Sequence, residues 1–112
     1  VCDALLGAAA AGDIGGHFPD TDSSYKDISS LLLLGRVREI VAAKGFAISN
    51  VDVTIITERP KMASYAARIA KNLADVLHLS TDEINIKAKT NEGMGFIGRG
   101  EGIAVMAVVA LK

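Results

Sequence analysis

The segment from residue 51 to residue 89 constrains the fold most, because it changes from a strand pattern to a helix pattern and back. Residues 51–56 alternate β-branched apolar residues with polar ones, which indicates a strand with one face on a core. Pro60 ends that strand. Residues 61–79 return to helical spacing, and residues 84–89 predict a second strand.

Two helices are predicted ahead of this unit. Residues 1–11 are rich in alanine and leucine and predict the first helix. Residues 27–44 predict the second, with Ser29 or Ser30 as its amino-terminal cap and Gly45 as its stop.

A long apolar run, residues 103–111, predicts a third strand at the end of the chain. The order of elements predicts one α/β (α+β) domain over residues 1–112, a ferredoxin-like layered sandwich with helices packed on one face of a small mixed β-sheet. The chain has only three Phe, two Tyr and no Trp, so its core has little side-chain volume. We therefore expect the last strand to pack also against other copies of the chain, as in a homo-oligomer.

Composition excludes several classes of protein. Hydrophobic residues make up 50% of the 112 residues and Pro only 2, so the chain is globular and not disordered. The net charge of −1 gives no overall attraction to nucleic acid or to an anionic membrane. Its apolar runs are shorter than the roughly 20 residues of a membrane-spanning helix. Cys2 is the single cysteine, which excludes an internal disulfide and fits a cytoplasmic protein.

Two loops carry polar residues that do not follow a helix or strand pattern. Residues 13–22 contain three Asp residues, which can bind sugar hydroxyls or a hard cation, or can simply form an Asp-rich turn. Residues 57–63 join the end of a strand to the start of a helix. Free backbone amides at such a junction suit a phosphate or the edge of a base, and the alternative is a plain strand-to-helix turn.

The third loop, residues 89–102, is rich in glycine but matches neither the phosphate-binding loop nor the dinucleotide-binding pattern. Its notable residues are Thr90 and Glu92, just past a strand. A hydroxyl on a phosphate oxygen and a carboxylate on a divalent cation are groups that phosphoryl transfer uses. His17 and His78 have no partners at metal-ligand spacing, so we interpret His17 as a solvated loop residue and His78 as a packing or capping residue.

These motifs together resemble those of the 2-C-methyl-D-erythritol 2,4-cyclodiphosphate synthase family, in the same order and over essentially all 112 residues. The block Gly98-Arg99-Gly100-Glu101-Gly102 with Phe96 is specific to that family. The other matching segments are Asp13-Ile14-Gly15, Phe18-Pro19-Asp20-Thr21-Asp22, residues 50–56 and Pro60-Lys61-Met62.

The resemblance implies a homotrimer with active sites between subunits, acting in the non-mevalonate isoprenoid pathway. The substrate would be 4-diphosphocytidyl-2-C-methyl-D-erythritol 2-phosphate, whose own 2-phosphate attacks the β-phosphorus and expels CMP. The implied metals are zinc and a magnesium or manganese ion. An isoprenoid diphosphate can occupy a cavity on the trimer axis of family members.

The resemblance also assigns roles to residues. Asp13, Ile14 and Gly15 would hold the ribose, and the segment Phe18, Pro19, Asp20, Thr21 and Asp22 would enclose the methylerythritol. The cytosine pocket would be formed, largely through backbone groups, by Thr57, Glu58, Arg59, Pro60, Lys61, Met62 and Ala63. Thr90 and Glu92 would be catalytic, with Glu92 also the magnesium ligand, and Lys89 and Asn91 would complete the phosphate site. Phe96, Arg99 and Glu101 would line or cap the axial cavity.

Two departures from the family matter. Members carry about forty more residues ahead of the position of Val1, and these include the zinc ligands. From this we expect the 112 residues alone to be inactive, and the native protein either to be longer or to have an amino-terminal segment that was lost or not observed. Lys89 stands where a Thr is common. Two other functions stay open: a trimeric cytidine-nucleotide-binding module without catalysis, and a ferredoxin-like regulatory domain that binds no cytidine nucleotide.

Overall fold

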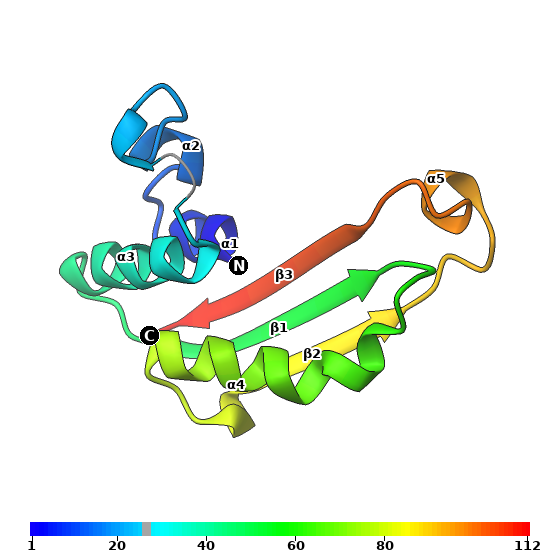
Figure 1. The fold of residues 1–112 in the computed structure, drawn as a ribbon. Coiled ribbons are helices and arrows are strands. Elements are labelled where there is room, and N and C mark those ends of the chain that lie inside the picture. Colours follow the sequence, from blue (N-terminus) through cyan, green and yellow to red (C-terminus); the bar gives the residue numbers. More distant parts are fainter. Residues whose placement is uncertain (26–27) are drawn as a thin grey trace.

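Strand β1 (Ile48–Ile56) is the centre of a three-stranded sheet in the computed structural model, which describes residues 1–25 and 28–112. The order is β2-β1-β3: β2 (Ile84–Lys89) runs parallel to β1, and β3 (Ala104–Leu111) runs antiparallel to it (Figure 1). Val51 lies opposite Ile84 on one side and Val109 on the other. The predicted small mixed sheet is confirmed.

Three helices cover one face of this sheet: α1 (Cys2–Ala8), α3 (Ser30–Ala43) and α4 (Ala66–Leu77) (Figure 1). The alternation in β1 explains which face they cover, since Val51, Val53 and Ile55 are buried whereas the residues between them are half-buried. The helices contribute apolar side chains to the same cluster, namely Leu5, Leu6, Leu34, Val37, Val41, Leu73, Ala74 and Leu77. Helices therefore lie on one face of the sheet, as predicted.

The ends of the predicted elements differ from the observed ones. Residues 1–11 were expected to be helical throughout, but α1 ends at Ala8 because Ala10 has a left-handed backbone (φ +53°) and the Ala11 amide closes the turn on the Leu6 carbonyl. Ser29 caps α3, and the predicted start of that helix at Asp27 lies outside the described residues.

In the segment 61–79, the first turn is a 3-10 helix (Met62–Tyr65) ahead of α4, and His78 ends α4 with φ +57°. Of the two roles predicted for His78, packing and capping, the structure shows capping. Strand β1 begins at Ile48, three positions earlier than predicted, because Ala47 and Lys112 exchange two backbone hydrogen bonds next to it. That pairing partner is distant in sequence and leaves no local signal.

Short helices occur in two segments that were predicted to be irregular. They are α2 (Ile14–His17) and α5 (Gly95–Gly98), and two further 3-10 turns cover Ser23–Tyr25 and Thr81–Glu83. Each of α2 and α5 is a single turn held by contacts outside itself, so helical periodicity cannot reveal it.

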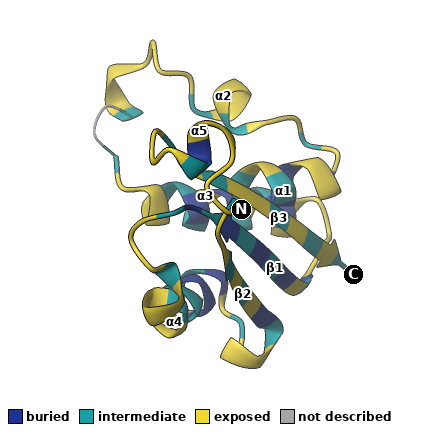
Figure 2. Cartoon of the chain, turned by 90° about the vertical axis from the view of Figure 1, so that its right-hand side faces the viewer, coloured by how far each residue is buried: buried dark blue, intermediate teal, exposed yellow. Residues whose placement is uncertain are grey.

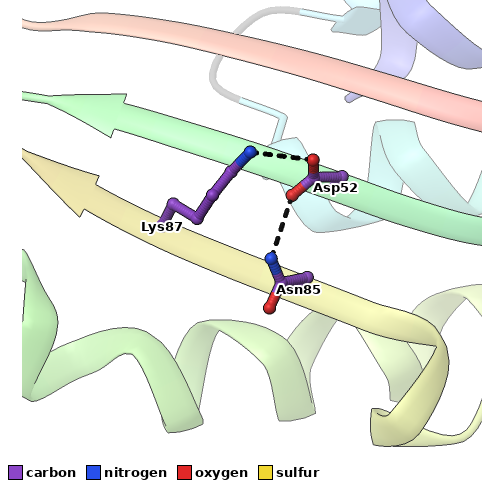
Figure 3. Close-up of polar contacts among 3 residues, drawn as sticks. All are labelled: Asp52, Asn85 and Lys87. Atoms are coloured by element: carbon purple, nitrogen blue, oxygen red, sulfur yellow. Dashed lines mark hydrogen bonds and ion pairs between the residues drawn. The ribbon is translucent and has the colours of Figure 1, made fainter.

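The face of the sheet opposite the helices carries a polar cluster formed by Asp52, Asn85 and Lys87 (Figure 3). One carboxylate oxygen of Asp52 accepts a hydrogen bond from Lys87 Nζ at 2.9 Å, and the other accepts one from Asn85 Nδ2 at 3.2 Å. These two bonds lower the pKa of the Asp52 carboxyl, the Lys87 bond more strongly. The cluster joins β1 to β2 on the side that no helix covers.

Strand β3 is much less covered than β1, as the burial colours of Figure 2 show. Val105, Met106 and Val108 are 56%, 58% and 70% exposed. Cys2, on the covered side, is half-buried beside the core, and burial raises the pKa of its thiol. Within the described residues, no helix has the length and apolar character needed to cross a membrane.

Candidate functional site at the carboxyl ends of β1 and β2

The loops that follow β1 and β2 leave the sheet at the same edge, because the two strands are parallel. The loop after β1 is bonded directly to the end of β2, since the Thr57 amide donates to the Lys89 carbonyl at 3.0 Å. Between the loops lies a cavity of about 210 Å³. Its lining residues are Thr57, Glu58, Pro60, Lys61, Met62, Ala63, Ala88, Lys89 and Thr90. The structure thus brings together two of the predicted site segments.

The wall formed by residues 57–63 is ordered by its own hydrogen bonds. Thr57 is buried, and its hydroxyl donates to the Arg59 carbonyl at 2.7 Å. The Arg59–Pro60 peptide is cis, and Met62 and Ala63 open the 3-10 turn that leads into α4. This wall offers apolar side chains and backbone groups, which suits the flat face and polar edge of a base.

Two lysines lie at the rim of the same cavity. Lys61 and Lys89 both line it and both are exposed, and they come from different loops. The pair brings two positive charges to a cavity whose lining is mostly apolar but also includes the acidic residue Glu58. Such a cavity suits a molecule with a base at one end and phosphates at the other.

Past Thr90 the chain makes a tight turn that carries Glu92. Backbone angles in the left-handed region occur at Glu92 (φ +53°) and Gly93 (φ +77°). The Thr90 hydroxyl accepts a hydrogen bond from the Glu92 amide at 3.4 Å, and Asn91 Nδ2 donates to the Met94 carbonyl at 2.7 Å. The turn therefore holds the Thr90 hydroxyl and the Glu92 carboxylate within one short segment.

The Glu92 carboxylate suits a magnesium or manganese ion. The Glu92 side chain is an exposed carboxylate three residues past Lys89, and Mg²⁺ is usually held by one or two carboxylates together with substrate phosphates. Zinc sites in proteins have at least three nitrogen, sulfur or oxygen ligands. In residues 1–25 and 28–112, no group of three or more His, Cys, Asp or Glu side chains is placed to hold a metal ion.

A second, larger cavity of about 560 Å³ lies between the loop after β1 and the glycine-rich segment. Arg99 Nε donates to Glu101 Oε2 at 2.7 Å on its wall. Phe96 is 54% exposed nearby, and its ring packs so closely on Gly102 that a Cβ there would lie 3.0 Å from the ring. Phe96, Arg99 and Glu101, which were predicted to act together, thus all lie in the glycine-rich segment beside this cavity.

The predicted segment 13–22 lies apart from these cavities, on the side of the fold where α2 is drawn in Figure 1. Asp13 caps α2 by accepting a hydrogen bond from the Gly16 amide at 2.8 Å. Asp22 accepts bonds from the Ser24 amide and hydroxyl, which lower the pKa of its carboxyl. His17 donates through Nε2 to the Ala11 carbonyl at 2.6 Å. Within one chain, this segment is not brought to the site.

One role at the site was missed in the sequence. Glu58 was expected to serve through its backbone, yet its carboxylate Oε1 accepts hydrogen bonds from the Asn91 amide at 3.0 Å and the Gly93 amide at 3.1 Å. These partners are 33 and 35 positions away along the chain. Only the pairing of β1 with β2 brings them together, so no local pattern could have indicated the contact.

Comparisons with known proteins agree with the resemblance seen in the sequence. All 112 residues match the model of the YgbB family. A 2-C-methyl-D-erythritol 2,4-cyclodiphosphate synthase of Syntrophus aciditrophicus is 56% identical over 112 residues, which are 100% of this chain and 70% of that protein. The protein of that name from Agathobacter rectalis is 52% identical over 99% of this chain and 63% of its own length. The chain thus spans roughly two thirds of these relatives.

Solved structures give the same picture. The bifunctional IspDF from Campylobacter jejuni superposes with a TM-score of 0.94 at 42% identity, over 98% of this chain and 30% of that one. A complex of Plasmodium falciparum IspF with CDP gives a TM-score of 0.86 at 33% identity, over 98% of this chain and 65% of that one. The chain belongs to the YgbB family, together with relatives named 2-C-methyl-D-erythritol 2,4-cyclodiphosphate synthase.

Proposed function

We propose that the protein converts 4-diphosphocytidyl-2-C-methyl-D-erythritol 2-phosphate to 2-C-methyl-D-erythritol 2,4-cyclodiphosphate and CMP, in the non-mevalonate isoprenoid pathway. The observation that carries this proposal is the cavity between residues 57–63 and the end of β2, which Thr90 lines, with Glu92 two positions further along the chain. Identity of 56% to a synthase of that name and the likeness to a structure with CDP support it.

In this proposal the cytosine enters the cavity and the diphosphate lies at its rim. Met62 and Ala63 pack against the base, and backbone groups of residues 57–61 recognise its polar edge. Lys61 and Lys89 attract the phosphates and offset their mutual repulsion. The protein needs no nucleophile of its own, because an oxygen of the substrate's 2-phosphate forms the new bond to the β-phosphorus while the bond from that phosphorus to the bridging oxygen of CMP breaks.

The catalytic groups of this chain would be Thr90 and Glu92. The Thr90 hydroxyl donates to a phosphate oxygen whose charge grows in the transition state, and Glu92 holds the magnesium or manganese ion. The ion, when bound, neutralises charge on the diphosphate. Positioning accounts for the rest of the rate, because the attacking and leaving oxygens must be in line with the phosphorus.

We also propose a homotrimer with sites between subunits. The exposed apolar side chains of β3, including Met106 and Val108, would be covered by other copies of the chain. Residues 13–22 would complete the site of a neighbouring subunit, which agrees with their separation from the cavity within one chain. Phe96, Arg99 and Glu101 would face the trimer axis, where an apolar surface beside an arginine suits an isoprenoid diphosphate.

The remaining expectations concern zinc and location. We propose zinc as a second metal, with ligands that are not assigned among the described residues. A single cysteine that is half-buried suits the cytoplasm, which we propose as the compartment.

CDP binding and CMP release together test the function. The protein is titrated with CDP in a calorimeter, with UDP as the control ligand, and CMP is measured by chromatography after incubation with the substrate and Mg²⁺. We expect CDP to bind more tightly than UDP and CMP to be released. Binding without release by the complete protein would favour a non-catalytic cytidine-nucleotide module, and absence of binding would overturn the proposal.

A further inference from the structure

Glu58 joins the two loops of the candidate site through one oxygen atom. Its Oε1 accepts hydrogen bonds from the Asn91 amide at 3.0 Å and from the Gly93 amide at 3.1 Å. The side chain is half-buried, and residues of its own loop line the proposed base pocket. A charged acceptor shared by two backbone amides makes stronger bonds than a neutral acceptor would.

The turn that Glu58 holds has a backbone conformation that its residue types do not favour. Glu92 has φ +53°, a left-handed conformation that a non-glycine residue rarely adopts unless its surroundings fix it. The amides on either side of Glu92 are the two that bond to Glu58, so the carboxylate fixes the backbone on both sides of this residue. The Glu92 side chain is exposed and points into no packed environment of its own.

We propose that Glu58 is a positioning residue, which holds Thr90 and Glu92 where they meet the diphosphate and its divalent ion. This inference rests on the proposed function. Glu58 acts through the backbone of the turn and touches neither phosphate nor metal, because a bare carboxylate would repel the phosphates whereas one bonded to two amides has much of its charge offset. The identity of the side chain at position 58 therefore matters, although the base pocket needs only its backbone.

Three variants separate positioning from other roles. Glu58→Ala removes the acceptor, Glu58→Gln keeps an oxygen that can accept both amide bonds without the charge, and Glu58→Asp keeps the charge on a shorter side chain. The matched control is Glu83→Ala, because the Glu83 carboxylate also accepts a hydrogen bond from a backbone amide, that of Ser80 at 2.9 Å, in the turn that precedes β2, whereas the site lies at the carboxyl end of that strand. All four variants leave the backbone groups that line the base pocket in place.

The measurement is the dissociation constant of CDP with and without Mg²⁺, read by calorimetry, together with hydrogen exchange at the Asn91 and Gly93 amides. For the wild type and Glu83→Ala, Mg²⁺ should tighten CDP binding. Glu58→Ala should lose roughly tenfold or more of that gain, and the amides of Asn91 and Gly93 should exchange faster. Glu58→Gln should retain most of the gain, and Glu58→Asp should lie between.

The outcomes distinguish the two proposals. If the wild type does not bind CDP, the proposed function fails and the inference falls with it. If the wild type binds CDP with an Mg²⁺ gain that Glu58→Ala keeps, or that Glu58→Gln loses as fully as Glu58→Ala, positioning is wrong while the proposed function stands. If Glu58→Ala does not fold, the comparison of Glu58→Gln with Glu58→Asp decides, because only positioning predicts that the neutral variant binds Mg²⁺ and CDP better than the charged one.

Discussion

The backbone of Gly93 lies directly against Gly98, so that a Cβ built on Gly98 would be 2.1 Å from the Gly93 carbonyl carbon. Non-bonded atoms do not approach so closely, and the obstacle is backbone, which cannot rotate away as a side chain can. Helix α5 and the turn that carries Glu92 are therefore packed together with no space between them. Only glycine is compatible with this contact.

Gly98→Ala should destabilise the protein by about 1–3 kcal/mol, because the added methyl group forces the turn away from α5. It should also weaken the Mg²⁺ gain in CDP binding, because the turn carries Glu92. The matched control is Gly7→Ala in α1, where a Cβ meets nothing within 4 Å and alanine is the better helix former, so stability should rise by about 0.5–1 kcal/mol. Chemical denaturation measures the free energy of unfolding of both variants. Equal changes in Gly98→Ala and Gly7→Ala would contradict the close contact between Gly98 and Gly93.

Thr90→Val and Glu92→Gln should each lower the rate of CMP release roughly a hundredfold or more, since each removes a group that meets the transition state. Glu92→Gln should also weaken the dependence of the rate on Mg²⁺. Thr81→Val and Glu83→Gln change the same residue types in the 3-10 turn before β2 and serve as controls. The rates are measured by steady-state kinetics at several Mg²⁺ concentrations. If Thr90→Val or Glu92→Gln is as active as its control, the substituted residue is not a catalytic group.

Acid should weaken the fold partly through Asp52. The Lys87 and Asn85 bonds hold the pKa of the Asp52 carboxyl below its ordinary value of about 3.9. The folded state therefore binds this proton less readily than the unfolded state. The stabilisation is complete above that ordinary pKa and is lost as the pH falls through the lower pKa of the folded state.

Two variants check this sign. Asp52→Asn should flatten the loss of unfolding free energy below pH 4, measured by urea denaturation at a series of pH values. Lys87→Met should raise the pKa of the Asp52 carboxyl toward its ordinary value, followed by NMR titration of the side-chain carbon, because the Lys87 bond is the larger cause of the shift. An unchanged titration in Lys87→Met would show that the pair seen in Figure 3 has no effect in solution.

The packing of α1 on the sheet predicts a large cost for truncating Leu6, which is fully buried. Leu6→Ala should lower the free energy of unfolding by about 2–5 kcal/mol. Leu32→Ala is the control, because Leu32 is 53% exposed, and its effect should stay within about 0.5 kcal/mol. Similar losses for both would mean that α1 contributes little to the core.

The oligomer can be tested on the open face of the sheet. Val108 is 70% exposed and lies opposite Asp52 across β1 and β3, so Val108→Lys should be tolerated within one chain through a new cross-strand charge pair. In a trimer that covers β3, the buried lysine should shift the population toward monomers. Sedimentation velocity measures the change, with Leu32→Lys on α3 as the control; trimers that persist in Val108→Lys would exclude this face from the interface.

The sequence predicts the layers of this fold well because each layer has its own period. Alternation at Val51, Val53 and Ile55 marks the covered face of β1, and the apolar spacing of residues 61–79 marks α4. What escaped prediction depends on partners far along the chain. The start of β1 at Ile48 is set by pairing with the end of β3, and α5 is set by the contact between Gly98 and Gly93.

The candidate site divides in the same way. Residues 57–63 and Thr90 could be predicted as neighbours, since each follows a strand and the strands lie side by side. The carboxylate of Glu58 could not, because its amide partners carry no side-chain signal. The predicted roles of individual site residues, including those of residues 13–22, stay predictions until the experiments above are done.

Strand β1 alone pairs with both other strands, and Glu58 lies two positions past its end. Deleting one residue within β1 would turn Asp52 toward the leucines of α1 and α4 and would expose Val51 and Val53, because side chains alternate along a strand. The same deletion would pull the Glu58 carboxylate about 3.3 Å away from its two amides. The number of residues in the middle strand is therefore constrained by folding and by the chemistry of the site at once.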